Sequence, residues 1–142
     1  MPASPFRFFE ERREYGPIFL RLILGSFLVW GTQDNVFSQA HMEEFAHFLA
    51  GLGFPWPMLG AVVSAYTQFL CGILLILGAF TRWISILLII NFIVALALAH
   101  RGDTFRGMFP ALVILFSSIF LLFHGAGKLS VDEWLERRRA LS

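Results

Sequence analysis

The chain has 142 residues, of which 57% are hydrophobic and 15% are charged, and its formal net charge is +1. Soluble domains usually carry about 25% charged residues, so this composition excludes an ordinary soluble enzyme and indicates an integral membrane protein. The near-neutral balance of charges predicts no nucleic-acid partner.

Four apolar stretches follow one another along the chain, and each is about long enough to cross a bilayer. They cover residues 17–37, 58–80, 83–100 and 107–127, close to the roughly 20 helical residues that a hydrocarbon core of about 30 Å requires. Short polar or Pro- and Gly-rich segments separate them. The sequence therefore predicts an all-α fold, an integral membrane four-helix bundle that forms a single domain over residues 1–142.

The segment between the first two spans has the pattern of an amphipathic helix over residues 39–51. Its larger apolar side chains fall within about 100° of one another at 100° per residue, and these are Phe45, Phe48, Leu49 and Leu52. Acidic residues and a histidine occupy the other side. We expect this helix to lie on the outer leaflet or across the mouth of the bundle.

The C-terminal segment is predicted to be a helix over residues 130–139. Ser130 and Glu133 fit the S-x-x-E capping box that begins many helices, and the segment ends in three arginines at positions 137–139. With Trp134 turned toward the acyl chains, the helix would lie on the cytoplasmic surface and gain about 1 kcal/mol per arginine from anionic lipid. A solvated charged tail is the alternative.

The distribution of basic residues predicts the orientation in the membrane. Eight of the eleven Lys and Arg residues fall on one side of the predicted bundle, and these are Arg7, Arg12, Arg13, Arg82, Lys128, Arg137, Arg138 and Arg139. Cytoplasmic segments carry the excess of basic residues in membrane proteins, so both termini are expected in the cytoplasm. We therefore predict a multi-pass protein of the cell (inner) membrane, in contact with the membrane lipids.

Two amide side chains lie deep in the predicted spans. Counted from the cytoplasmic ends at about 1.5 Å per residue, Gln68 lies about 18 Å and Asn91 about 12 Å inside. Polar side chains at such depth normally face the other helices. They either form interhelical hydrogen bonds or contact a ligand such as a quinone or a lipid headgroup, because a quinone carbonyl needs such a donor inside an apolar cleft.

Basic side chains are expected to gather at the cytoplasmic end. If the helices pack up and down, Arg21, Thr81, Arg82, His124 and Lys128 converge there in a cationic pocket. The histidine can relay protons near neutral pH, and it can also bind a headgroup phosphate together with the arginines. Alternatively, these are ordinary interfacial residues that follow the positive-inside pattern.

Neither a catalytic constellation nor a metal site is predicted. Cys71 is the single cysteine, so the chain has neither an intramolecular disulfide nor a C-x-x-C pair for thiol exchange. Histidines and carboxylates on the outer side include ligand types for a metal, but their spacing fits no metal-binding template. Because four spans leave no room for a second domain, any redox cofactor domain must come from another chain.

Four segments together resemble the DoxX family of small membrane proteins. They read Arg21-Leu-Ile-Leu-Gly25, Gln68-Phe-Leu-Cys-Gly72, Gly78-Ala-Phe-Thr81-Arg82 and Gly125-Ala-Gly127-Lys128-Leu-Ser130-Val-Asp132. The resemblance covers nearly the whole chain and implies a four-helix protein related to the small subunit of thiosulfate:quinone oxidoreductase and to membrane partners of thiol and oxidative-stress enzymes. The chain departs from the family pattern at Gln68, where many relatives have Glu, and at Asp34, near which a basic residue is common.

The sequence leaves two functional hypotheses. The first is an accessory membrane subunit of a quinone- or thiol-linked redox assembly, which binds quinone or lipid or anchors a soluble oxidoreductase. Its candidate ligand-binding residues are Arg21, Gln68, Arg82, Asn91 and His124. The second is a non-catalytic membrane scaffold or lipid-binding protein whose polar residues only hold the helices together. A small transporter is less favoured because the spans carry no intramembrane acid, and homo-oligomerisation is left open.

Overall fold

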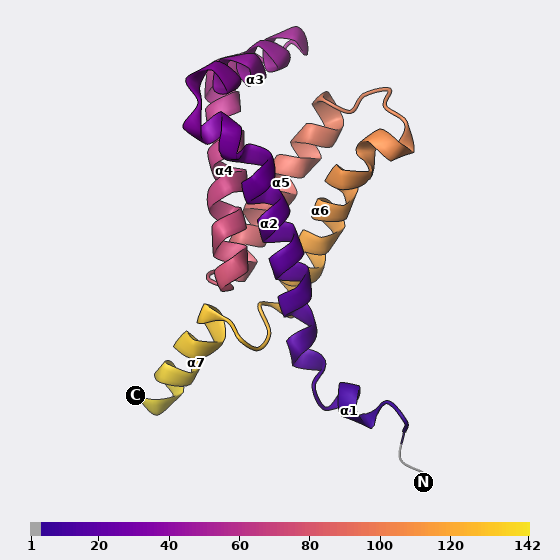
Figure 1. Ribbon diagram of the computed structural model, residues 1–142, viewed down its shortest axis with the longest axis vertical. Helices are drawn as coiled ribbons and strands as arrows, with labels where there is room; N and C mark the ends of the chain where they lie inside the picture. The colour runs from indigo at the N-terminus through magenta and orange to yellow at the C-terminus, as the bar shows by residue number, and fades with distance from the viewer. Residues whose placement is uncertain (1–3) are drawn as a thin grey trace.

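The computed structural model describes residues 4–142, and within these residues the secondary structure is entirely helical (Figure 1). The helices in chain order are α1 (Arg7–Glu10), a short 3-10 helix η1 (Arg13–Tyr15), α2 (Gly16–Phe37), α3 (Gln39–Gly51), α4 (Pro57–Leu77), α5 (Thr81–Leu98), α6 (Phe105–His124) and α7 (Val131–Leu141). Helices α2, α4, α5 and α6 are long and apolar enough to cross a membrane. The prediction of an all-α protein with four membrane-spanning helices is confirmed.

The helix ends differ from the predicted spans by a few residues, and the backbone explains why. Helix α4 stops at Leu77 because Gly78 adopts a left-handed conformation with φ of 68°, the usual helix-ending geometry of glycine. The chain then turns so tightly that α5 already begins at Thr81. At the other end of the bundle, Thr104 caps α6 by accepting a hydrogen bond from the backbone N–H of Gly107.

The four long helices pack as two pairs. Helix α2 lies along α4, and α5 lies along α6, while the contacts between α4 and α5 are fewer (Figure 1). Gly25 and Gly72 allow the first pair to approach closely, since a Cβ atom on Gly25 would lie 2.5 Å from the carbonyl oxygen of Gly72. The pairs share one apolar core, formed by Leu24, Leu28, Cys71, Leu75, Ile84, Leu88, Phe92, Ala111, Ile114 and Leu121.

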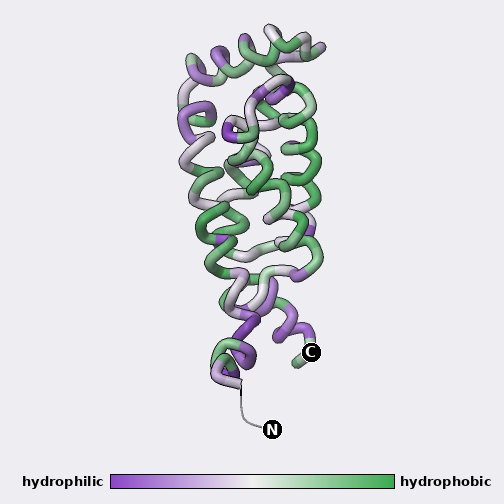
Figure 2. The backbone as a smooth tube through the Cα atoms, turned by 90° about the vertical axis from the view of Figure 1, so that its right-hand side faces the viewer, coloured by the Kyte–Doolittle hydropathy of each residue, from purple (hydrophilic) through white to green (hydrophobic). Residues whose placement is uncertain are grey.

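Both termini lie at one end of the bundle and α3 lies at the other (Figure 1). Figure 2 shows hydrophobic residues along the middle of the bundle and hydrophilic residues concentrated toward its two ends. This distribution suits a protein that crosses a membrane, because apolar side chains face the hydrocarbon. That the end with the termini is cytoplasmic remains a prediction from the positive-inside pattern.

Helix α3 packs against α4 partly through its predicted apolar face, since Phe45 and Leu49 lie partly buried against the contact. The buried contacts join Met42 and Ala46 of α3 to Ala61 and Ala65 of α4. The larger Phe48 is half exposed instead. Two helices approach most closely through small side chains, so the alanines lie at the centre of the contact and the predicted Phe45 and Leu49 lie beside it.

Residues 125–132, which we call the strap, join the end of α6 to α7 and cross the base of the bundle. The backbone N–H of Lys128 donates to the carbonyl oxygen of Glu14 at 2.8 Å, and that of Asp132 donates to the carbonyl oxygen of Gly78 at 3.0 Å. The strap therefore connects the start of α2 with the turn between α4 and α5.

The carboxylate of Asp132 also caps α5. Its Oδ1 accepts from the backbone N–H of Phe80 at 2.7 Å, and its Oδ2 accepts from that of Thr81 at 2.9 Å. A helix N-terminus has unpaired N–H groups and a partial positive charge, both of which a carboxylate satisfies. A residue of the C-terminal segment thus replaces the local capping side chain that α5 lacks.

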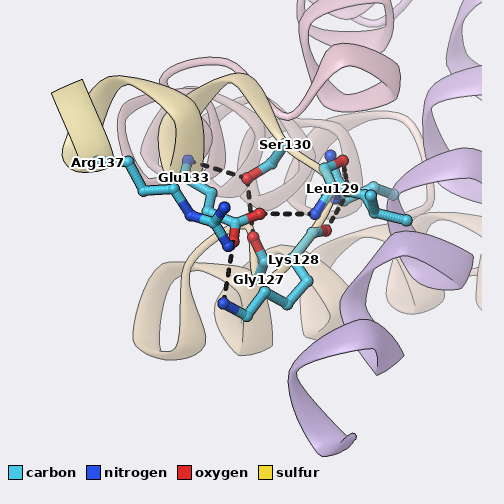
Figure 3. Close-up of polar contacts among 7 residues, drawn as sticks. Gly127, Lys128, Leu129, Ser130, Glu133 and Arg137 are labelled. Atoms are coloured by element: carbon cyan, nitrogen blue, oxygen red, sulfur yellow. Dashed lines mark hydrogen bonds and ion pairs between the residues drawn. The ribbon is translucent and has the colours of Figure 1, made fainter.

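The predicted capping box at the start of α7 is present (Figure 3). The Oγ of Ser130 accepts from the backbone N–H of Glu133 at 3.1 Å, and Oε2 of Glu133 accepts from the backbone N–H of Leu129 at 2.9 Å. Oε1 of Glu133 also pairs with Lys128 Nζ at 3.0 Å and with Arg137 Nη2 at 2.6 Å. The hydrogen bond from Lys128, followed by the other donors and charges, lowers the pKa of the Glu133 carboxyl despite its partial desolvation.

Candidate functional site

A cleft with a volume of about 680 Å³ lies between α4 and α5, and we call it the α4–α5 cleft. Phenylalanines of α3 and the following turn line its outer end, so the cleft lies on the side of the bundle away from the termini. Most of its walls are aliphatic or aromatic, and its polar lining residues are Ser64, Thr67, Gln68, Asn91, His100 and Asp103.

Three of these polar side chains form a continuous hydrogen-bonded row. Gln68 Nε2 donates to Ser64 Oγ at 3.0 Å, and Ser64 Oγ donates to Asn91 Oδ1 at 2.9 Å. Gln68 and Ser64 lie one helical turn apart on α4, and the second hydrogen bond crosses from α4 to Asn91 on α5. Because α4 ends at Leu77 and α5 starts at Thr81, both amides lie about 14–15 Å from the base of the bundle. The expected depths of about 18 and 12 Å were therefore wrong.

The row leaves one donor unused at its end on α5. Asn91 Nδ2 is buried and has no hydrogen-bond partner among residues 4–142. An unpaired buried donor costs about 1–3 kcal/mol, and buried polar groups are paired in most proteins. Since Asn91 lines the cleft, its amide is the member of the row that has a hydrogen-bond donor left over beside the cleft.

A second polar pair lies at the outer mouth of the same cleft. His100 Nδ1 and Asp103 Oδ2 are 2.8 Å apart, and both residues line the cleft. The carboxylate orients the ring and leaves Nε2 as the nitrogen that can exchange a proton. His100 follows Asn91 by nine residues, which corresponds to about 14 Å along a helix.

Arg21 lies at the opposite end of the bundle and is completely buried. Its Nη2 donates to the carbonyl oxygen of Leu129 at 3.0 Å and to that of Lys128 at 3.4 Å. The guanidinium also lies against Gly78, where any Cβ atom would collide with Nη1. The strap therefore covers Arg21, and the side chain binds backbone carbonyls of its own chain.

Arg82 and His124 lie at the same end as Arg21 but have different partners. Arg82 Nη2 donates to the carbonyl oxygen of Phe123 at 3.4 Å, near the end of α6. His124 Nε2 lies 3.6 Å from Glu14 Oε1, and its ring stacks on Phe120 with 5.4 Å between centroids. The structure brings the predicted basic residues to one end of the bundle and gives each a separate internal contact.

The five candidate residues thus fall into two groups. Gln68 and Asn91 meet in the α4–α5 cleft, while Arg21, Arg82 and His124 secure the base of the bundle. Sequence reasoning did not single out Ser64, although it lies four residues before Gln68 and so on the same helix face. The pairing of His100 with Asp103 had a local signal too, because a four-residue turn brings its first and last residues together, and the backbone N–H of Asp103 donates to the carbonyl oxygen of His100 at 3.1 Å.

These features define a helical membrane protein with four spans and a cleft between α4 and α5, on the side of the bundle away from its termini. The family model of DoxX matches residues 16–101, which is more than half of the chain, so the chain belongs to the DoxX family. The match contains α2 to α5 and every polar residue of the cleft except Asp103. No curated protein and no solved structure gave a significant match.

Proposed function

We propose that this protein is an accessory membrane subunit of a quinone- or thiol-linked redox assembly, and that it binds a quinone in the α4–α5 cleft. The observation that carries the proposal is the unpaired Nδ2 donor of Asn91, a residue that lines a mostly apolar cleft. Relatives of the DoxX family act with quinone- and thiol-linked enzymes, which gives the proposal its redox context.

A quinone fits the chemistry of the cleft better than a charged molecule does. Its ring is flat and uncharged, and each carbonyl oxygen accepts one or two hydrogen bonds. The walls supply aromatic side chains such as Phe45 and Phe48 from α3, and the donor is supplied by Asn91. Apolar pockets with a few placed polar groups are the general form of small-molecule sites.

The redox cofactor of such an assembly would come from a soluble oxidoreductase that docks at the end with the termini. Arg137, Arg138 and Arg139 are exposed there on α7, and basic surfaces speed association with acidic partners. With the positive-inside orientation, this end faces the cytoplasm and the protein resides in the inner membrane. The membrane subunit then holds the quinone for its partner.

The test is equilibrium binding of a short-chain ubiquinone to the purified full-length protein in nanodiscs, followed by native mass spectrometry. We expect one quinone per protein. Asn91→Leu should reduce the affinity for quinone at least tenfold. Gln68→Leu should reduce it less, because Ser64 separates Gln68 from Asn91 in the hydrogen-bonded row. Gln33→Leu on α2 is the matched control, since Gln33 lies outside the cleft lining. Equal affinity of all three variants and the unmodified protein would argue against the proposal.

The second candidate function is a non-catalytic scaffold or lipid-binding protein. One observation favours it, namely that the Ser64–Asn91 hydrogen bond joins α4 directly to α5, as in polar contacts that only stabilise helix packing. Under this alternative the preparation would contain only exchangeable phospholipid and no saturable quinone. The same native mass spectra therefore distinguish the two functions.

A further inference from the structure

We propose that the His100–Asp103 pair exchanges protons between the aqueous phase and a quinone bound at Asn91, at the end of the bundle away from the termini. The inference rests on the proposed function, because it concerns the ligand of the same cleft. It adds a proton-exchange site and a direction from which protons reach the ligand.

The ionisable groups of the cleft are concentrated at its mouth. Among the described residues that line it, His100 and Asp103 are the ones with ionisable side chains, and the parts contributed by α3 and α4 are uncharged. Two arginines, Arg101 and Arg106, are close to the pair in sequence. Arg101 Nε donates to the carbonyl oxygen of Ala97 at 2.7 Å. Arg106 is exposed in the first turn of α6.

The pair is both accessible and connected to the interior. The side chain of His100 is 26% exposed and that of Asp103 is 45% exposed, so water reaches them directly. Between them and Asn91 the cleft extends past small or aliphatic side chains such as Ala95 and Ala99. Because about 14 Å separates His100 from Asn91 along the helix, proton transfer runs through water in the outer part of the cleft, and His100 is a proton-exchange residue, not one that touches the ring.

The chemistry requires such a group. Reduction of a quinone by two thiols forms one disulfide and two quinol O–H bonds, so two electrons and two protons reach the ring oxygens. In the reverse direction, two ferricyanide ions take the two electrons one at a time, both O–H bonds break, and two protons leave. The amide of Asn91 donates to a ring oxygen but does not titrate, whereas a histidine exchanges protons readily near neutral pH.

The experiment oxidises bound quinol and follows the protons. Full-length protein in nanodiscs is loaded with one equivalent of short-chain ubiquinol and mixed with ferricyanide in a stopped-flow instrument, with a pH-indicator dye in the buffer. We expect His100→Ala and Asp103→Asn to slow proton release about tenfold or more, with quinol affinity unchanged. Added imidazole should restore the rate in His100→Ala, which a merely structural role would not allow. His47→Ala, on α3 outside the cleft lining, is the control and should leave the rate unchanged.

The outcomes separate this inference from the proposed function. If the unmodified protein binds no quinol, the proposed function fails and the proton-exchange site fails with it. If all variants bind quinol normally and release protons as fast as the unmodified protein, only the proton-exchange site is overturned. Slow release without rescue by imidazole would also overturn it, because the effect would then come from altered packing at the mouth.

Discussion

The amide of Asn91 combines an unpaired donor with a position inside the cleft. In the described part of the chain no atom accepts from its Nδ2, which costs about 1–3 kcal/mol in a buried site. Functional sites often retain such local costs in exchange for binding. Arg21, Thr81 and Ser118 also have buried polar atoms without a partner in the described residues, and Asn91 differs from them in lining the cleft.

We therefore predict opposite effects on stability from two neighbouring substitutions. Asn91→Leu removes the unpaired donor, and Ser64 can rebond to a carbonyl of its own helix, so the free energy of unfolding should stay equal or rise by about 1 kcal/mol. Ser64→Ala leaves both amides without their partner and should lower the free energy of unfolding by about 1 kcal/mol. Unfolding in mixed detergent micelles measures both. A larger loss for Asn91→Leu than for Ser64→Ala would mark the amide as structural.

Glu133 gives the attachment of α7 a dependence on pH. Its pKa in the folded protein lies below the ordinary value of 4.5, mainly because Lys128 donates to it. A carboxyl whose folded pKa is lowered stabilises the fold above its unfolded pKa, and this contribution is lost as the pH falls through the folded pKa. The start of α7 should thus loosen in acid, below about pH 4.5.

The fluorescence of Trp134 measures this loosening when the other three tryptophans are replaced by phenylalanine. Near neutral pH, Arg138 lies 4.0 Å above the Trp134 ring, and we expect the emission to change as the pH falls below 4.5. Glu133→Gln should remove the transition, whereas Glu136→Gln, at an exposed position, should retain it. An unchanged transition in Glu133→Gln would assign the effect to another carboxyl.

For single residues, the sequence showed which polar side chains lie inside the spans, but it did not show which of them lie close together. Hydropathy showed that Gln68 and Asn91 lie far inside their spans, and the structure places both beside one cleft. Which way each helix turns its polar face depends on contacts between helices that are distant in sequence. For the same reason, the sequence could not show that the strap would cover Arg21.

Among the elements, the crossing of α2 and α4 depends on two glycines. A Cβ atom on Gly25 would lie 2.5 Å from the Gly72 carbonyl oxygen and 2.7 Å from Cγ1 of Ile76, so the helices would have to separate. Gly31 lies on the same helix with no atom within 4 Å of such a Cβ. The two positions form a matched pair for testing close packing.

We predict that Gly25→Ala lowers the free energy of unfolding by about 2 kcal/mol through this overpacking. Gly31→Ala should be neutral or raise it by up to about 1 kcal/mol, because alanine has the higher helix propensity. Denaturation with an ionic detergent, followed by far-ultraviolet circular dichroism, compares the two proteins. Equal stability of the two variants would contradict the close approach at Gly25.

The capping of α5 by Asp132 is the second prediction at the scale of elements. Asp132→Ala removes the acceptor of two backbone N–H groups and should lower the free energy of unfolding by about 1–2 kcal/mol, the usual loss for a helix cap. Asp34→Ala removes an exposed carboxylate and should have little effect. If the two variants unfold alike in the same detergent titration, the cap does not stabilise α5.

The secondary structure was predictable in large part because its signals are local. Runs of apolar residues indicated four spans, and the Ser130–Glu133 spacing indicated the start of α7, where the structure shows the capping bonds. The contact face of α3 was predictable in part, because Phe45 and Leu49 of the apolar pattern pack beside it, whereas Met42 and Ala46 at its centre depend on the small alanines of α4. The cap of α5 comes from a residue more than 50 positions away, so no local pattern contains it.

Over the whole molecule, the two helix pairs meet at one end and separate at the other (Figure 1). The strap fastens the start of α2 to the turn between α4 and α5, while the α4–α5 cleft lies on the side of α3. The class of fold followed from composition, because a chain with 57% hydrophobic residues has few alternatives to membrane helices. The tilt between the pairs depends on side-chain packing and was not readable from the sequence.

The packed core beneath the cleft has a kinetic consequence. Leu28, Leu75, Leu88 and Leu121 are almost completely buried, and they belong to the apolar core that the two helix pairs share. A molecule bound beside Asn91 therefore has to leave by the route through which it arrived. The oxidised and reduced forms of one ligand would then enter and leave through the same opening of the cleft. Each form should therefore inhibit binding of the other competitively, and the saturation curves should show no cooperativity.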